Sequence, residues 1–209
     1  MKPSVPTVFV VDDDFLILKA LTRLFRSVDM EAAPFASPRE FLDQFDPGAP
    51  GCLVLDLEMP GFGGIELQQE LAALGSELPV IFLTGHGSIP ASVQAMKQGA
   101  VDFLTKPVHD GDLLEAVRAA LEKDRMNRRA RNELAEIREK LALLTPRERE
   151  VLSHVVSGRL NKQIAADLGT VEKTIKVHRA HLMSKLAVRT VADLVRLAER
   201  AGITPAHKK

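Results

Sequence analysis

The sequence predicts an α/β domain with a five-stranded, doubly wound parallel sheet, joined by a helical linker to an all-helical domain. Short apolar strands alternate with amphipathic helices five times between residues 7 and 121, and this alternation requires a parallel sheet covered on both faces. Beyond residue 144, short helical segments are separated by glycine turns. Residues 1–121 carry 8 basic and 17 acidic side chains, and residues 122–209 carry 20 and 11, so the two halves should have different functions.

The first two strand and helix pairs have clear local signals. Residues 7–11 form a β-branched strand that stops at three consecutive acids. Residues 15–28 have apolar side chains at mixed spacings of three and four, which predicts an amphipathic helix. Residues 31–34 are a weaker candidate for an edge strand. A short helix at residues 37–44 begins with a capping Ser, then Pro, then an acid at its third position.

The third strand is the centre of the predicted sheet. Residues 52–55 are a continuous apolar run that leads into Asp56, and the Pro and Gly residues that follow prevent a strand or helix from continuing. Continuous runs of this kind are typical of parallel strands buried on both faces. The remaining elements are a helix at 65–74, a strand at 79–83, a helix at 89–98, a strand at 101–104 and a helix that opens near Asp110.

Polar side chains follow four of these strands: Asp12, Asp13, Asp56, Thr84 and Lys106. The carboxyl ends of parallel strands lie along one edge, where open α/β sheets bind ligands, so these side chains should converge. Three carboxylates repel one another unless a cation is present, and Mg²⁺ is a hard ion that prefers such oxygens. The set favours transfer of a phosphoryl group to a carboxylate, with Lys106 and the Thr84 hydroxyl binding the added oxygens.

Four motifs of this half carry a family resemblance. They are the acidic run at residues 12–13, DLEMPG at 56–61, LTGHG at 83–87 and LTKP at 104–107. Together they resemble the receiver domain of two-component response regulators, which is similar to the chemotaxis protein CheY, and the resemblance covers residues 7–121. Which two of the three consecutive acids form the pair is open. We take Asp12 and Asp13 because they come directly after the strand, which leaves Asp14 to cap the first helix.

The resemblance implies a role for individual residues. They are the phosphoacceptor Asp56, the Mg²⁺ ligands Asp12, Asp13, Asp56 and the main-chain carbonyl of Glu58, the phosphoryl-binding Thr84 and Lys106, and the switch aromatic Phe103. The family often has Tyr at this last position, so a role for a phenolic hydroxyl is absent here.

The connector at residues 121–144 contains no Pro or Gly, and its apolar side chains recur at intervals of three or four. The last helix of the α/β domain should therefore continue as a long amphipathic linker helix. Its apolar stripe either forms a coiled coil with a second chain or packs against the chain's own domains. The stripe has fewer than four regular heptads, which favours packing against its own domains. The expected parts are the receiver at residues 1–121, the linker at 122–140 and a helical domain at 141–209.

The carboxyl-terminal half opens with a strong helix start. Thr145 is the expected N-cap, followed by Pro and by Glu at the third position. Helices are expected at residues 146–157, 161–168, 172–186 and 191–201. Gly169 lies in the turn between the second and third of them, and two short helices around a tight glycine turn are a helix-turn-helix.

The helix at residues 172–186 has two different faces. Its expected core face contains Val171, Ile175, His178, Leu182 and Leu186. The opposite face is basic with small side chains and fits a DNA major groove, where Lys can reach guanine acceptors and Val a thymine methyl. The candidate DNA contacts are Lys173, Lys176, Val177 and Ala180, with Asn161, Lys162, Thr174, Arg179, Arg159 and Lys185 as further phosphate contacts.

The segments LTPREREVL, NKQIAADL and TIKVHRAHLMSKL are similar to the LuxR-type helix-turn-helix. With the receiver, they make the chain resemble a response regulator of the NarL/FixJ class. Lys176 and Val177 match base-contacting positions of that family. Ala180 stands where some members have a long polar side chain, which leaves the base preference there open.

The expected function is that of a phosphorylation-activated, DNA-binding transcriptional regulator with Mg²⁺ as cofactor, and not of an enzyme. An aspartyl-phosphate hydrolase would need a second Asp two residues after Asp56, where this chain has Glu58. A signalling adaptor that binds only proteins would lack the basic helix face. The implied partners are a sensor histidine kinase, double-stranded promoter DNA and RNA polymerase, with a homodimer formed on phosphorylation. No apolar run is long enough to span a membrane, so we expect a cytoplasmic protein.

Overall fold

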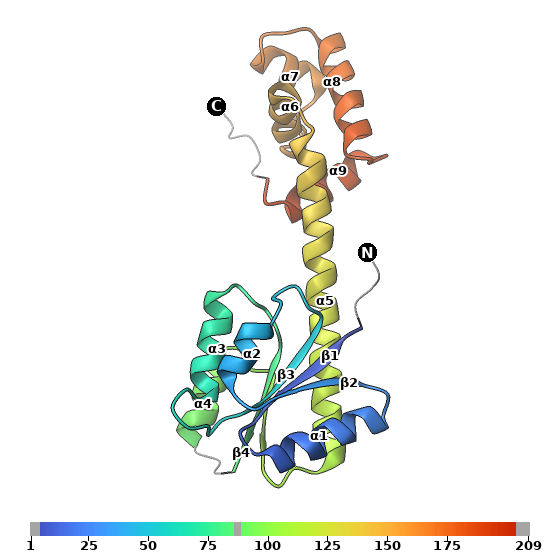
Figure 1. The fold of residues 1–209 in the computed structure, drawn as a ribbon. Coiled ribbons are helices and arrows are strands. Elements are labelled where there is room, and N and C mark those ends of the chain that lie inside the picture. Colours follow the sequence, from blue (N-terminus) through green and yellow to red (C-terminus); the bar gives the residue numbers. More distant parts are fainter. Residues whose placement is uncertain (1–4, 86–88, 204–209) are drawn as a thin grey trace. The chain divides into compact units, whose positions relative to one another are not determined.

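The structure is a computed structural model that describes residues 5–85 and 89–203. The chain divides into two compact units, Met1–Arg128 and Arg129–Lys209 (Figure 1). Part of the motif at residues 83–87 lies outside the described residues. Among the described helices, none has the length and apolar character needed to cross a membrane.

The first unit is the predicted parallel sheet with its covering helices. Its five strands are all parallel and follow the order β2-β1-β3-β4-β5. The order reverses at β1, which lies between β2 and β3, so the carboxyl ends of β1 and β3 flank the position where doubly wound sheets bind ligands. The elements are β1 Thr7–Val11, α1 Phe15–Ser27, β2 Glu31–Phe35, α2 Pro38–Gln44, β3 Gly51–Asp56, α3 Gly64–Ala73, β4 Val80–Thr84, α4 Ile89–Lys97, β5 Asp102–Thr105 and α5 Asp110–Ala142.

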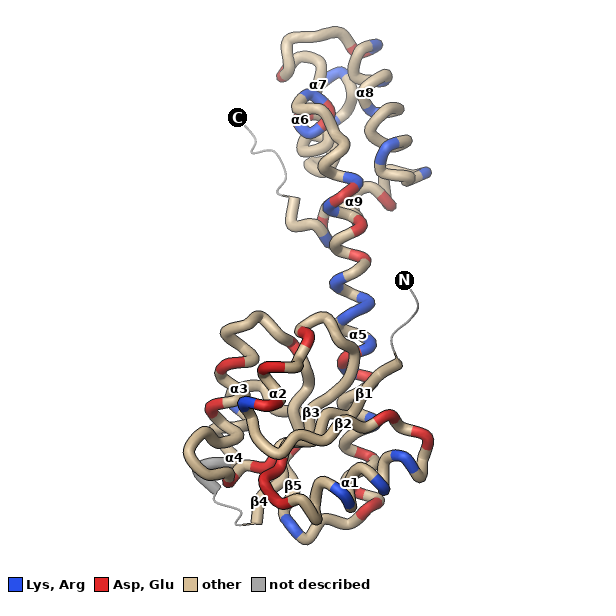
Figure 2. The backbone as a smooth tube through the Cα atoms, viewed as in Figure 1, with Lys and Arg blue, Asp and Glu red and all other residues tan. Residues whose placement is uncertain are grey.

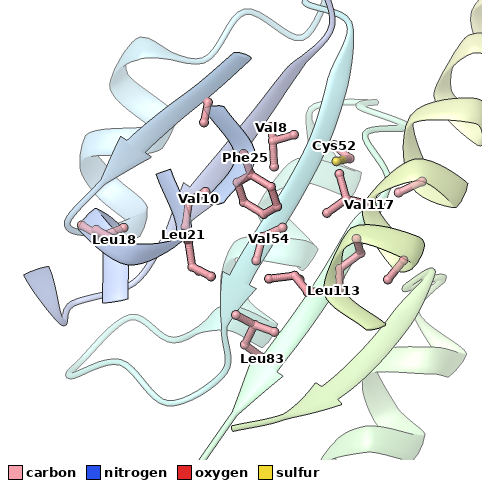
Figure 3. Close-up of a cluster of buried hydrophobic side chains, with 14 residues drawn as sticks. Val8, Val10, Leu18, Leu21, Phe25, Cys52, Val54, Leu83, Leu113 and Val117 are labelled. Carbon is pink, nitrogen blue, oxygen red and sulfur yellow. The ribbon is translucent and has the colours of Figure 1, made fainter. Parts of the chain in front are cut away.

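Two apolar layers hold the sheet, one on each face. Alternate residues of a strand point to opposite faces, so Val8 and Val10 of β1 pack under α1 and α5, whereas Phe9 and Val11 pack under α2, α3 and α4. Figure 3 shows the first layer, in which Phe25 of α1 lies among side chains of the central strands. Burial on both faces explains why the central strands are continuous apolar runs, and it confirms the predicted fold class.

A polar contact joins α5 to the amino-terminal end of β3. The buried carboxylate of Asp124 accepts hydrogen bonds from Gly51 N–H at 3.0 Å and from Arg128 Nε at 2.7 Å. The Arg128 guanidinium also donates to the carbonyls of Gly48, at 2.7 Å, and Ala49. A Cβ at Gly51 would lie 2.0 Å from the main-chain oxygen of Thr7, so only glycine fits beneath this contact. Residues 124–128 of α5 are therefore fixed to the first unit.

The second unit contains the predicted helix-turn-helix. Its helices are α6 Pro146–Val156, α7 Asn161–Asp167, α8 Glu172–Lys185 and α9 Val191–Arg200. Gly169, with φ +62°, makes the turn between α7 and α8. The core of the unit contains Ile164 of α7 and Ile175 and Leu182 of α8. The prediction was wrong for Val171, which is 65% exposed because it is the N-cap residue and precedes the helical face.

One predicted phosphate contact, Lys185, also has a structural role. Lys185 Nζ donates to the buried carboxylate of Glu148 at 2.7 Å and to the Leu143 carbonyl at 3.2 Å, which ties α8 to the start of α6. Glu148 and Thr145 also form the predicted capping box. The hydrogen bond from Lys185, followed by those from Thr145, lowers the pKa of Glu148 to about 2.

The Glu148 contact predicts a pH-dependent stability of the second unit. Because the pKa is lowered on folding, the stabilisation is complete above the usual value of 4.5 and is lost as the pH falls towards about 2. Glu148→Gln keeps a residue suited to the capping box but removes the charge, and should cost about 1 kcal/mol at pH 7. Amide hydrogen exchange of α6 should show this loss at pH 7 and a smaller one near pH 3. Glu150→Gln, which changes an exposed acid of the same helix, should show neither effect.

Candidate functional site

Three carboxylates gather at the carboxyl ends of β1 and β3. Asp12 follows β1 and is 1% exposed, Asp56 ends β3 and is 5% exposed, and Asp13 is exposed. The parallel register, which pairs Val11 with Leu55, brings the residues that follow side by side. One oxygen from each carboxylate lies within 4.8 Å of the others. We call these three residues the acidic cluster; Figure 2 shows acidic positions gathered at this end of the sheet.

Lys106 bridges two members of the acidic cluster. Its Nζ atom lies 2.7 Å from Asp12 Oδ2 and 2.8 Å from Asp56 Oδ1. The Lys106 main-chain N–H donates to the Thr84 carbonyl at 2.7 Å, so the end of β4 positions the lysine. Lys106 is 94 residues from Asp12 and 50 residues from Asp56 in the sequence, and the parallel topology of the sheet brings the three side chains together.

The electrostatics of the site follow from burial and crowding of like charges. Burial raises the pKa of Asp56, the bonds to Lys106 oppose that change, and repulsion by Asp12 and Asp13 adds to it. Burial disfavours the ammonium form of Lys106, but hydrogen bonds to Asp12 and Asp56 outweigh this, so the net shift of the Lys106 pKa is upward. The site therefore holds a charged lysine and a carboxylate that a further cation would keep ionised.

The donor atoms at this edge suit a hard divalent cation. The acidic cluster offers carboxylate oxygens, the ligands that Mg²⁺ prefers, and Mg²⁺ completes its shell with water or phosphate oxygens. Asp14 is occupied elsewhere, since its Oδ1 accepts from Leu16 N–H at 2.7 Å and caps α1, as predicted. Glu58 lies in the loop after β3 with an exposed side chain, and its main-chain carbonyl stays a predicted ligand.

Thr84 and Phe103 lie on the adjacent strands. Thr84 ends β4 and is fully buried. Phe103 in β5 is half-buried and its ring centroid lies 6.4 Å from that of Phe82 in β4. The strands that carry the predicted phosphoryl-binding and switch residues are thus direct neighbours, paired from Ile81 to Thr84.

Sequence reasoning missed one residue beside the site. A Cβ at Gly64 would lie 2.5 Å from the Asp56 main-chain oxygen and 3.0 Å from the Phe82 ring, so the start of α3 can approach the end of β3 only with glycine there. The available signal was the Gly63-Gly64 pair at a helix start, where Ser, Thr or Asp is usual.

The second unit presents the predicted DNA-facing side of α8. The side chains of Lys173, Lys176, Val177 and Ala180 are all exposed, and Val177 is 46% exposed despite being apolar. Lys176 Nζ lies 3.1 Å from Glu172 in an exposed pair at i,i+4, which contributes little and can be exchanged for a phosphate. A helix face with exposed cations and small apolar groups is chemically suited to contact base edges in the major groove.

The remaining predicted contacts fall into two groups. Lys162 is exposed on α7, and Thr174 is half-buried on α8. Arg179 Nη1 donates to Asn161 Oδ1 at 2.6 Å, so these two residues hold α7 against α8. Arg159 pairs with Asp167 in the same region. The structure brings Asn161 and Arg179 together, a pairing that sequence reasoning did not anticipate.

Comparison with known proteins identifies both units. Residues 8–118 match the response regulator receiver domain family, and residues 142–198 match the bacterial regulatory proteins of the luxR family. Nodulation protein W of Bradyrhizobium diazoefficiens is 48% identical over 200 residues, which cover 96% of this chain and 88% of that protein. The transcriptional regulatory protein FixJ of Azorhizobium caulinodans is 42% identical over 206 residues, covering 99% and 97%.

Solved structures agree with these matches. The response regulator StyR has a TM-score of 0.86 and 45% identity, covering 94% of this chain and 100% of that chain. Full-length FixJ from B. japonicum has a TM-score of 0.58 and 37% identity, covering 96% and 98%. The chain therefore belongs to the NarL/FixJ class of two-component response regulators, transcriptional regulators in which a receiver domain precedes a LuxR-type DNA-binding domain.

Proposed function

We propose that the chain accepts a phosphoryl group at Asp56 from a phosphohistidine of a sensor histidine kinase, and that this raises its affinity for promoter DNA in the cytoplasm. The observation that carries the proposal is the position of Asp56. Its carboxylate belongs to the acidic cluster at the ligand-binding edge of the sheet, 2.8 Å from Lys106 Nζ. In this proposal Asp56 is an acceptor in a single transfer, and the chain is not a turnover catalyst.

The transfer follows from the chemistry of these side chains. An oxygen of Asp56 attacks phosphorus while the P–N bond of the phosphohistidine breaks. Lys106 already contacts Asp56 Oδ1, so its charge can stabilise the transferred oxygens with little movement. The Thr84 hydroxyl would donate a further hydrogen bond. Mg²⁺, held by the acidic cluster and the Glu58 carbonyl, would neutralise negative charge on the phosphoryl group.

We infer that the signal then passes through β4 and β5. A phosphoryl group that binds Thr84 and Lys106 would change the ends of both strands, and the half-buried Phe103 would move to a second position in response. The surface of α4, β5 and α5 is the proposed homodimer interface. Symmetric oligomers are mostly twofold dimers, so the DNA site should be an approximate inverted repeat.

Sedimentation and DNA binding test this coupling. DNA selected by the protein from a random library would be titrated with and without acetyl phosphate and Mg²⁺. Phosphorylated protein should sediment as a dimer and bind at least tenfold more tightly, since a dimer adds a second half-site. Lys106→Ala should weaken this response. A phosphorylated protein that remains monomeric and binds DNA no more tightly would contradict the proposal.

A separate prediction concerns α8, the helix that we propose contacts the DNA bases. Lys176→Ala should weaken binding to the selected DNA by about 1–3 kcal/mol if the lysine contacts a base edge, with a smaller loss on random DNA. Lys162→Ala, which removes a proposed phosphate contact on α7, should weaken binding to both DNAs and reduce the slope of log affinity against log salt concentration by about one. Electrophoretic mobility shifts at several salt concentrations separate the two. Arg196→Gln, an exposed position of α9, is the matched loss of charge and should leave binding near the wild-type value.

A further inference from the structure

A groove with a volume of about 650 Å³ runs between α1 and the edge strand β2 in the first unit. This volume is within the usual range for sites that bind small molecules. Leu18 and Thr22 of α1 and Pro34 of β2 line it, and Phe15, 72% exposed, lies at the amino-terminal end of α1. The acidic cluster does not include any of these residues, so the groove is a separate feature.

The groove is basic although its domain is acidic. Lys19, Arg23 and Arg26 follow one another at spacings of four and three, which places them on one stripe of α1, and all three line the groove. They are exposed, and none has an ion-pair partner within residues 5–85 and 89–203. Figure 2 shows basic positions along α1. The one acid in the lining is Glu40, whose carboxylate accepts a hydrogen bond from Ala36 N–H at 2.8 Å.

A polar atom without a partner points to a ligand as well. The hydroxyl oxygen of Thr22 is buried and has no hydrogen-bond partner among the described residues. Such a group costs about 1–3 kcal/mol compared with a satisfied one. The oxygen itself has almost no accessible surface, so a ligand oxygen in the groove would remove that cost after rotation of the Thr22 side chain towards the groove. The hydroxyl and the neighbouring cations favour the same ligand chemistry, an anion.

The edge strand does not favour a peptide as occupant. Strand addition relies on main-chain hydrogen bonds along an open edge, and Pro34 has no N–H to donate. Recognition must then depend on side chains: the apolar surface of Phe15 and Leu18, the Thr22 hydroxyl and the three cations. This combination suits a small molecule with one apolar part and one charged group.

We propose that the groove between α1 and β2 binds a small amphipathic anion, an apolar body that carries a carboxylate, sulfonate or phosphate group. The proposal goes beyond phosphoryl transfer and does not depend on Asp56. The apolar part would cover Leu18 and Phe15, and the anionic group would accept hydrogen bonds from Thr22 and from the arginines.

The full-length protein can be tested with two fluorescent probes of the same ring system. 8-Anilino-1-naphthalenesulfonate carries the anionic group, and N-phenyl-1-naphthylamine lacks it. The sulfonate should bind at a saturable site, and Arg23→Gln combined with Arg26→Gln should weaken it about tenfold while changing the neutral probe little. Thr22→Val should weaken the sulfonate about threefold. Arg118→Gln, an exposed charge elsewhere in the domain, should have no effect.

A second basic cavity provides an internal control. Arg138 and Arg149 line a cavity of about 410 Å³ in the second unit, and their replacement by Gln would reveal sulfonate bound there instead. Binding that is lost in that variant and kept in the Arg23 and Arg26 double variant would overturn the proposal. So would equal affinity of the wild type and the double variant. Because the chain contains no Trp or Tyr, far-ultraviolet circular dichroism would confirm that each variant is folded.

Discussion

Replacing Asp56 with Asn is expected to abolish phosphorylation of the protein. The amide keeps the size of the carboxyl group but is not a nucleophile towards phosphorus. Wild-type protein incubated with acetyl phosphate and Mg²⁺ should gain one phosphoryl group by intact-mass spectrometry, stable in acid and labile in base. The Asp56→Asn protein should gain none, and its circular dichroism spectrum should match that of the wild type.

The matched control is Asp14→Asn, which changes the third acid of the run beside the site. Asp14 caps α1, and Asn caps a helix as well as Asp does, so this variant should be labelled to the wild-type extent. Equal labelling of the Asp56→Asn protein would show that another residue accepts the phosphoryl group. Loss of labelling in Asp14→Asn would show that the acids assigned to Mg²⁺ are the wrong pair.

Asp124→Ala is expected to have the largest effect on stability, with a loss of about 3 kcal/mol in the unfolding free energy of the first unit. The buried carboxylate accepts from Gly51 N–H and from Arg128 Nε, and both of these donors lose their acceptor in the variant. The second oxygen, Asp124 Oδ1, has no partner among the described residues, so part of the burial cost is uncompensated. Because this unpaired oxygen makes the wild-type contact less favourable, the expected loss of unfolding free energy is at the lower end of the range for removing one partner of a buried ion pair.

The chain contains no Trp or Tyr, so unfolding in urea would be followed by far-ultraviolet circular dichroism, with hydrogen exchange of β1 and β3 to assign the transition. Glu122→Gln is the control. Glu122 lies two residues before Asp124 on α5 and forms an exposed ion pair with Arg125, and surface pairs of this kind contribute little to stability. If Asp124→Ala unfolds at the same urea concentration as this control, the contact does not hold α5 to the sheet.

The sequence by itself was sufficient for the fold class and for predicting that the acidic cluster and Lys106 lie together. Strand ends such as Asp56 are marked locally by an apolar run followed by Pro and Gly, and the topology of a parallel sheet brings all such ends to one edge. The N-cap at Asp14 and the capping box at Thr145 were readable for a related reason, because partner and cap lie within three residues of each other.

Only the tertiary structure decided which partner each charged side chain has. Lys185 and Glu148 are 37 residues apart, and Gly51 and Asp124 are 73 apart, so no local pattern relates them. Lys185 and Arg179 both lie on a basic helix and looked alike as phosphate contacts, yet Lys185 holds a buried carboxylate and Arg179 holds Asn161. Periodicity tells which face of an element is buried. The choice of a hydrogen-bond partner depends on how elements that are distant in sequence pack against one another, and that is set by the three-dimensional fold.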